Sequence, residues 1–137
     1  MGNRIMQVQF VCLLLGLLSA VELCASLDFY QKHVIGNMLE YECATVMQTR
    51  QINGRNGGCK KINTFLLDTG VRVRNTCAHG DGTHNVGFNV VVCRRVVISS
   101  HPNCSYTGRR HDNRIVPIMC KHGVPVHLHS SKLVKLF

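Results

Sequence analysis

Two histidines and a lysine, far apart in the sequence, are the residues best suited to catalysis. Lys60 lies in the stretch Cys59–Phe65, whereas His33 lies near the start of the chain and His127 near its end. At neutral pH one imidazole can accept a proton while another donates one. A lysine ammonium can stabilise negative charge that develops on a phosphate. If the fold brings these three segments together, the residues predict acid–base chemistry on a phosphate ester.

Residues 1–26 are typical of a secretory signal peptide. Arg4 precedes a nearly unbroken apolar run from Phe10 to Leu18, which is too short to span a bilayer, and the small residues Ala25 and Ser26 follow. We expect cleavage near Ser26, rather than an uncleaved anchor, and a single domain over residues 27–137. The protein is therefore predicted to be secreted and extracellular.

The cysteines support this interpretation. Cleavage near Ser26 would remove Cys12 and Cys24 from the eight cysteines and leave six. An even number in a small secreted chain predicts disulfides, which also stabilise a domain with a small core. Spacing alone does not choose among the possible pairings.

The net charge of +9 indicates a polyanionic partner. The signal segment contributes Arg4 and Glu22, which cancel, so the secreted domain keeps the whole charge. RNA, anionic membranes and glycans are the candidate partners, and a basic surface that only maintains solubility is the alternative. Tryptophan is absent and aromatic residues are few, which disfavours an extended stacking platform for single strands.

The pattern of apolar residues predicts helices first and strands afterwards. The first helix is expected from Asp28 to about Asn37, with Phe29 and His33 on one face, and the second from Met38 to Gln51. The strands are expected at Ile62–Leu67, Val71–Arg74, Val86–Ile98, Cys104–Tyr106, Arg114–Lys121 and Val124–Leu128. This order predicts an α+β domain with an antiparallel sheet.

Three motifs resemble those of the pancreatic ribonuclease (ribonuclease A) superfamily. Cys59–Phe65 fits the pattern Cys-Lys-x-x-Asn-Thr-Phe, His101–Tyr106 resembles the Pro-Asn-Cys-x-Tyr hairpin, and Val124–Leu128 resembles the C-terminal Pro-Val-His strand. The resemblance implies a ribonuclease A-like fold, with N-terminal helices packed on a curved antiparallel sheet. It also implies three disulfides, Cys43–Cys93, Cys59–Cys104 and Cys77–Cys120. The fourth disulfide of pancreatic members is missing, so the chain is most similar to the angiogenin-like members.

The resemblance implies a metal-independent endoribonuclease that needs no cofactor. His33 would remove the proton of the RNA 2′-hydroxyl, His127 would protonate the departing 5′-oxygen, and Lys60 would stabilise the phosphoryl charge. The product would be a 2′,3′-cyclic phosphate on the 3′ side of a pyrimidine, because Thr64 would pair with the pyrimidine edge. The implied substrate-binding residues are Lys32, Asn63, Thr64 and Leu128. A monomer is expected, with a ribonuclease inhibitor as a further partner.

Two positions depart from the family pattern. Lys32 stands where a glutamine commonly precedes the first histidine, and His129 stands where an aspartate often orients the second. Without that carboxylate, His127 should have a lower pKa, and the enzyme should be weaker than a pancreatic member.

Two other functions compete with the ribonuclease hypothesis. The first is an angiogenin-like signalling or antimicrobial host-defence protein that acts through the pairs Arg94-Arg95 and Arg109-Arg110, with incidental catalysis. The second is a zinc protein, which the lack of any Cys-x-x-Cys pair disfavours.

Overall fold

The structure is a computed structural model that describes residues 18–129, with side chains from residue 21. Its helices are α2 (Leu18–His33), η1 (Glu40–Glu42), α3 (Cys43–Thr49), α4 (Gly70–Asn75) and η2 (Thr76–His79). Its strands are β1 (Val34–Ile35), β2 (Ile62–Leu67), β3 (Gly82–Arg95), β4 (Tyr106–Lys121) and β5 (Val124–Leu128). Most of the expected signal segment lies outside the described residues, and none of the described helices is long and apolar enough to cross a membrane.

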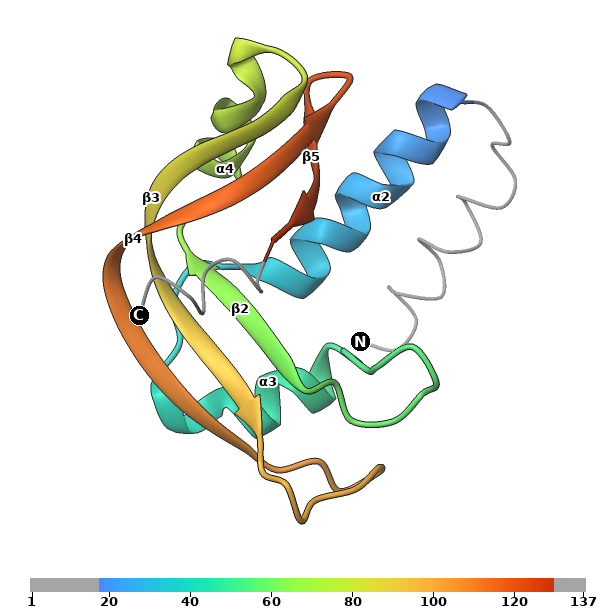
Figure 1. The fold of residues 1–137 in the computed structure, drawn as a ribbon, viewed down its shortest axis with the longest axis vertical. Helices are drawn as coiled ribbons and strands as arrows, with labels where there is room; N and C mark the ends of the chain where they lie inside the picture. The colour runs from blue at the N-terminus through green and yellow to red at the C-terminus, as the bar shows by residue number, and fades with distance from the viewer. Residues whose placement is uncertain (1–17, 130–137) are drawn as a thin grey trace.

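The five strands form one sheet in the order β1-β2-β3-β4-β5. The short β1 runs parallel to β2, and all other neighbours are antiparallel. The long β3–β4 hairpin curves along one side of the molecule, α2 lies beside β5, and α3 packs near the opposite end of the hairpin (Figure 1). The expected α+β architecture, helices on a curved and largely antiparallel sheet, is confirmed.

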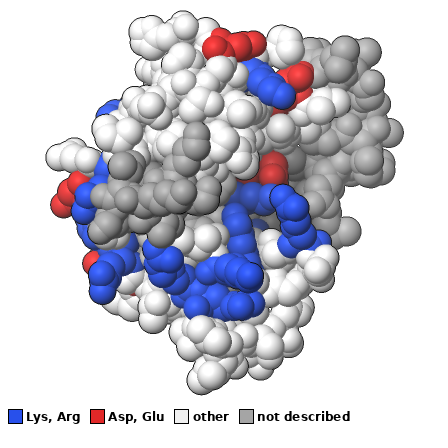
Figure 2. Space-filling model, viewed as in Figure 1, with Lys and Arg blue, Asp and Glu red and all other residues white. Residues whose placement is uncertain are grey.

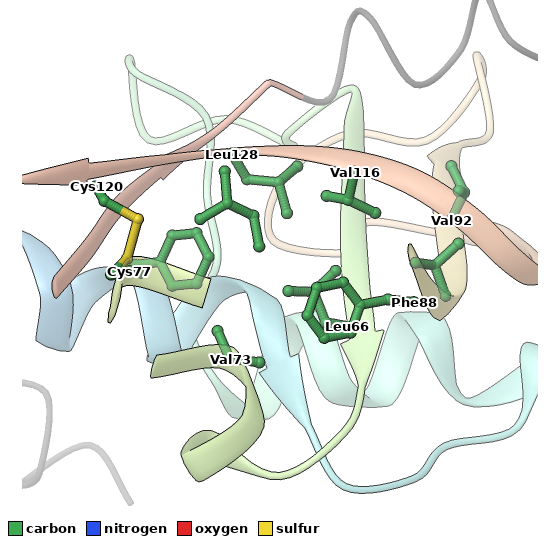
Figure 3. Packing of buried hydrophobic residues seen from close by; sticks show 11 residues of the cluster. Leu66, Val73, Cys77, Phe88, Val92, Val116, Cys120 and Leu128 are labelled. Atoms are coloured by element: carbon green, nitrogen blue, oxygen red, sulfur yellow. A yellow bond between two sulfur atoms is a disulfide. The ribbon is translucent and has the colours of Figure 1, made fainter. Parts of the chain in front are cut away.

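Alternating side chains of the sheet supply two cores. One core contains Phe29 of α2, Val73 of α4 and Leu128 of β5 around the middle of β3 and β4 (Figure 3). The other core places Phe65 and Val91 against Met47 of α3. Burial of this kind contributes roughly 1.5–3 kcal/mol for each large apolar side chain. The two faces of β2 therefore fix both helices that flank the candidate site.

The three expected disulfides are present with the expected pairing. Cys43–Cys93, Cys59–Cys104 and Cys77–Cys120 join residues 50, 45 and 43 positions apart. Loops of this length restrict the unfolded chain strongly, and each disulfide stabilises the fold by about 2–4 kcal/mol. The disulfide Cys59–Cys104 fixes the residue directly before Lys60.

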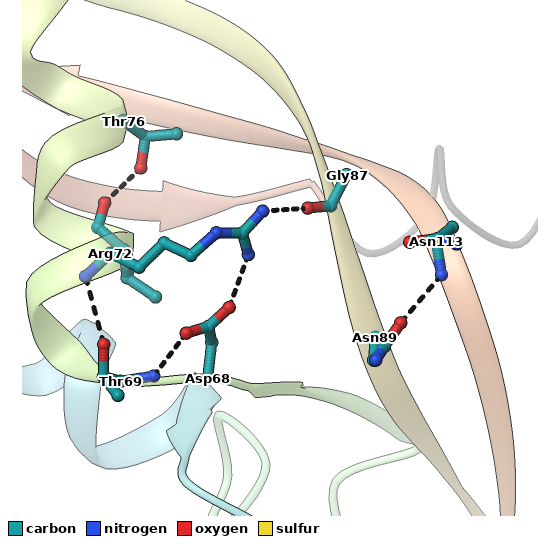
Figure 4. A network of polar contacts seen from close by, with 8 residues as sticks. Asp68, Thr69, Arg72, Thr76, Gly87, Asn89 and Asn113 are labelled. Atoms are coloured by element: carbon teal, nitrogen blue, oxygen red, sulfur yellow. Dashed lines mark hydrogen bonds and ion pairs between the residues drawn. The ribbon is translucent and has the colours of Figure 1, made fainter.

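The segment Val71–Arg74 is helical, so the expected strand there is wrong. Thr69 caps α4, since its hydroxyl accepts a hydrogen bond from the backbone N–H of Arg72, and the Arg72 side chain contacts Asp68 and the carbonyl of Gly87 (Figure 4). Valine and arginine alternate here, but only Val73 is buried. A good N-cap outweighs the weak strand pattern.

The strands expected separately at Cys104–Tyr106 and Arg114–Lys121 are joined without a turn, because β4 runs unbroken from Tyr106 to Lys121. The polar residues 107–111 pair with β3, and the register shifts at a β-bulge between Phe88 and Val90. At this bulge the backbone N–H of Asn113 donates a hydrogen bond to the side-chain oxygen of Asn89. Gly108 is required in this strand, because a β-carbon there would collide with the carbonyl oxygen of Glu40.

The first helix differs from the expectation at both ends. It begins at Leu18 and ends at His33 instead of Asn37, and the β-branched pair Val34-Ile35 continues directly into β1. Such residues favour extended backbone, and pairing with β2 satisfies their backbone groups. His33 is therefore the last residue of α2 and lies where the helix meets β2.

Candidate active site

His33 is fixed at the junction of α2 and β2. Its Nδ1 lies 2.9 Å from the carbonyl oxygen of Thr64, and its ring packs 5.3 Å from the ring of Phe29, measured between centroids. A carbonyl can only accept a hydrogen bond, so Nδ1 carries the proton and Nε2 keeps the lone pair. This tautomer leaves Nε2 as the atom that can remove a proton from a substrate.

Arg50 holds the end of α2 in place. Its Nη1 donates at 3.0 Å to the carbonyl oxygen of Gln31, which lies in the last turn of α2 and has no partner within the helix, and at 2.7 Å to that of Val34, the first residue of β1. No sequence pattern pointed to this role, because Arg50 is 17 positions beyond His33 and belongs to no motif. We therefore regard Arg50 as a positioning residue for His33.

Lys60 is held beside His33 by Asn63. The Lys60 ammonium donates to Asn63 Oδ1 at 2.8 Å, and Asn63 Nδ2 donates to the carbonyl oxygen of Lys32 at 2.8 Å. The backbone of Lys60 is fixed as well, since its carbonyl accepts a 2.8 Å hydrogen bond from the hydroxyl of Tyr106. The fully buried Asn63 thus connects the lysine to the last turn of α2.

His127 comes from β5, where it lies opposite Met119. Its ring meets the ring of His129 edge to face, with centroids 4.8 Å apart. The backbone N–H of His129 donates to the carbonyl oxygen of Pro117 at 3.1 Å, which fixes that residue after the strand has ended. Among the described residues, His129 takes the place beside His127 that the family resemblance assigns to a carboxylate.

Lys32, His33, Lys60 and His127 lie close enough to act on one another electrostatically. Burial lowers the pKa of His33 to about 3, and the charges of Lys60, Lys32 and His127 act in the same direction. Burial lowers the pKa of Lys60 to about 8, with a further decrease from Lys32 and an opposing effect of Asp28. Burial also lowers the pKa of His127, and His129, Lys60 and Lys32 add to this effect. At pH 7 the site therefore holds a neutral His33 next to positive charge.

Lys32 and Leu128 differ in what they can offer to a ligand. The Lys32 ammonium forms a 2.9 Å ion pair with Asp28 one helical turn earlier, and both side chains are partly exposed. The side chain of Leu128 is buried in the core, so any contact with a substrate must come from its backbone.

Thr64 has an unused hydroxyl. The residue is fully buried between the two cores, its carbonyl is bonded to His33, and its Oγ1 has no hydrogen-bond partner among the described residues. Leaving a buried hydroxyl unpaired is costly, and such groups call for an explanation. A ligand that offers a donor or an acceptor to Oγ1 would supply it. The next residue, Phe65, lies in the core.

The strand register places the two members of the pair Arg109-Arg110 on opposite faces of the sheet. Arg109 lies opposite Val92, which lies opposite Thr64, so Arg109 occupies the same face of the sheet as Thr64, about 10 Å away by the spacing of neighbouring strands. Arg110 points to the other face and forms an ion pair with Asp112 at 2.9 Å. Figure 2 shows Lys and Arg side chains gathered over the lower half of the same view, where β2, β3 and β4 run.

Two other features lie outside this site. A pocket of about 410 Å³ lies between α3 and the hairpin around Pro102, and none of the expected catalytic residues lines it. No cluster of three His, Cys, Asp or Glu with metal-binding geometry is found within residues 18–129.

Comparison with known proteins agrees with this geometry. The model of the pancreatic ribonuclease family matches residues 25–129. The chain belongs to this family. It is 33% identical to "Ribonuclease-like 3" of Danio rerio, over 77% of this chain and 78% of that protein, and 34% identical to "Angiogenin" of Gallus gallus, over 74% and 76%. The X-ray structure of zebrafish RNase5 superposes with a TM-score of 0.69 at 28% identity and covers 77% of this chain and 92% of that one. The chain is thus a ribonuclease-type protein with angiogenin-like relatives.

Proposed function

We propose that this ribonuclease-type protein cleaves single-stranded RNA on the 3′ side of pyrimidines, with the substrate's 2′-hydroxyl as the nucleophile. The observation that carries the proposal is that Lys60 and His127, from distant segments, act electrostatically on His33. The buried imidazole of His33 is itself hydrogen-bonded to the carbonyl oxygen of Thr64. His33 Nε2 removes the 2′-OH proton as that oxygen attacks phosphorus, and His127 gives its proton to the departing 5′-oxygen. The products are a 2′,3′-cyclic phosphate and a 5′-hydroxyl. Water then opens the cyclic phosphate with the histidine roles exchanged.

Lys60 supplies the positive charge for the transition state. Its ammonium is partly buried and already held by Asn63, so little reorganisation is needed when charge develops on the phosphoryl oxygens. Lys32 adds a second positive charge near the same place. The nucleophile belongs to RNA itself, and DNA, which lacks the 2′-hydroxyl, would bind without being cleaved.

Thr64 is the proposed selector of the base. Its unpaired hydroxyl and its position beside the base-catalyst His33 support this role. A pyrimidine that hydrogen-bonds to Oγ1 would place its 2′-hydroxyl towards His33. Because a buried hydroxyl accepts either a donor or an acceptor edge, both uracil and cytosine would fit.

The test is cleavage of a short fluorogenic RNA with one internal uridine, in the presence of a metal chelator. We expect His33→Ala and His127→Ala each to lower kcat/KM by on the order of 10²–10⁴-fold. His79→Ala, at an exposed histidine of η2, is the matched control and should cleave like the unmodified protein. Substrates with adenosine or 2′-deoxyuridine at the internal position should remain intact. Cleavage that survives either active-site substitution, or that proceeds at deoxyuridine, would refute the mechanism.

We also propose that the protein is secreted and acts on RNA as a monomer. Three disulfides favour an oxidising compartment. Mass spectrometry of the protein secreted by expressing cells should give an N-terminus within a few residues of Leu27. A secreted product that still contains residues 1–17, or retention of the protein inside the cell, would contradict this.

A further inference from the structure

The tip of the β3–β4 hairpin is a fixed turn. We call residues Val96–Ser99 the 96–99 turn. The backbone N–H of Ser99 donates to the carbonyl oxygen of Val96 at 2.9 Å, and the N–H of Val96 donates to the carbonyl oxygen of Ser105 at 2.8 Å. The disulfide Cys59–Cys104 attaches the returning strand of this loop to the rest of the domain. The turn therefore has a defined shape.

Two large aliphatic side chains occupy the corners of the 96–99 turn. Val97 is 87% exposed and Ile98 is 93% exposed, more than any other large apolar side chain in the described residues. Turn corners favour Gly, Pro, Asn, Asp and Ser, and β-branched residues gain nothing there from the fold. Neither side chain belongs to either core. Folding alone does not account for them.

Basic residues flank the turn. Arg94 and Arg95 end β3 just before it, and Lys61 is joined to Arg95 by a 2.9 Å backbone hydrogen bond. The hairpin-tip segment 91–111 contains no Asp or Glu, and neither does the segment 43–67, which contains α3 and β2. Figure 2 shows the same arrangement, with Lys and Arg gathered next to an end of the molecule that carries no charged side chains.

We propose that the 96–99 turn inserts Val97 and Ile98 into the surface of an anionic lipid bilayer. Arg94, Arg95 and Lys61 would lie at the level of the headgroups and bind their phosphates. An apolar tip with adjacent positive charge matches the two layers of such a surface, because apolar insertion and attraction to anionic headgroups both favour binding. This function is independent of RNA cleavage, since none of these five residues belongs to the catalytic site.

The chain has no tryptophan, which allows a single fluorophore to be placed at the tip. We expect the fluorescence of an Ile98→Trp variant to shift to the blue when phosphatidylcholine vesicles containing phosphatidylglycerol are added, and brominated acyl chains should quench it. Val71→Trp is the matched control. Val71 is 61% exposed and has an arginine neighbour, but it lies on α4, away from the hairpin tip (Figure 1). Its fluorescence should change little. If the tryptophan of the vesicle-bound Ile98→Trp variant is neither shifted nor quenched, the proposal is overturned, because the protein then adsorbs by charge alone.

A second experiment measures the contribution of the two side chains. A Val97→Ser/Ile98→Ser double variant places turn-forming residues at both corners. Its partition into the anionic vesicles should fall at least tenfold, while cleavage of a short RNA in solution and the melting temperature stay unchanged. Vesicles of phosphatidylcholine alone should bind the unmodified protein weakly. Equal partition of the double variant and the unmodified protein, or equal binding to both vesicle types, would refute the inference.

Discussion

Replacing His129 with aspartate should make His127 a stronger base and move the pH profile of RNA cleavage upwards. In the structure the pKa of His127 is lowered by burial first and by the neighbouring charge of His129 second. His129→Asp removes a positive neighbour and adds a negative one at the same position. His127 must be protonated to act as the general acid, so its pKa sets the alkaline limb of kcat/KM.

The distance between the two rings gives the magnitude. The centroids of His127 and His129 are 4.8 Å apart. Two unit charges at about 5 Å interact by about 0.8 kcal/mol in a water-like dielectric, which we use because His127 is only partly buried and its residue remains accessible to solvent. This energy corresponds to about 0.6 of a pH unit. Loss of one repulsion and gain of one attraction of similar size should raise the pKa of His127 by about one pH unit, and His129→Asn should give about half of that.

The assay combines the pH dependence of kcat/KM with NMR titration of the His127 ring. His79→Asp changes the net charge equally at a distant exposed site and serves as the control. We expect the alkaline limb and the NMR pKa of His127 to move upwards together in His129→Asp and to stay in place in His79→Asp. The reasoning fails if the pKa of His127 is unchanged or falls in His129→Asp. It also fails if both aspartate variants raise it equally. The NMR measurement needs no cleavage, so it remains informative even for an inactive protein.

Three further substitutions test the rest of the site. Thr64→Val should leave the melting temperature unchanged or raise it, because the hydroxyl has no partner to lose among the described residues, while cleavage at uridine falls at least tenfold in a kinetic assay. Asn63→Ala should lower the free energy of unfolding by about 1–3 kcal/mol in urea titrations and also lower kcat, because it strands the carbonyl of Lys32 and frees Lys60. Between pH 3 and 6.5 the unfolded chain binds a proton at His33 that the folded chain does not, so stability rises with pH in this window by up to about 1.4 kcal/mol per pH unit. Thermal melts of His33→Gln should show a smaller slope in that window than melts of the unmodified protein.

The sequence predicted best the strands in which a hydrophobic pattern and a family motif coincide. β2 and β5 coincide with the expected strands because each carries a motif as well as buried residues. The two residues left between the expected strands Arg114–Lys121 and Val124–Leu128 do form a tight turn, since His122 and Gly123 adopt positive φ, at 52° and 76°. In contrast, Val71–Arg74 was mistaken for a strand, because alternation over four residues cannot be distinguished from one helical turn.

The convergence of His33, Lys60 and His127 was expected only from the resemblance to the ribonuclease family. Nothing in the local sequence determines that α2, β2 and β5 meet. Arg50 and Tyr106 were missed as positioning residues for the same reason, since their hydrogen bonds to Val34 and Lys60 cross 16 and 46 positions. Contacts of this kind depend on the tertiary fold and leave no periodicity behind.

The charge distribution of the site also explains why it suits a substrate that brings its own negative charge. Lys60, Lys32 and His129 all lower the pKa of His127, and the one carboxylate acting on Lys60 is Asp28, which is already paired with Lys32. A phosphate between Lys60 and the two histidines would oppose each of these repulsions, so binding must raise the pKa values of both His33 and His127. By linkage, a phosphate-containing ligand must bind more tightly as the pH falls through the pKa of the histidines in the complex. The free protein thus keeps His33 neutral and ready to act as a base, and the substrate itself favours the protonated His127 that completes the reaction.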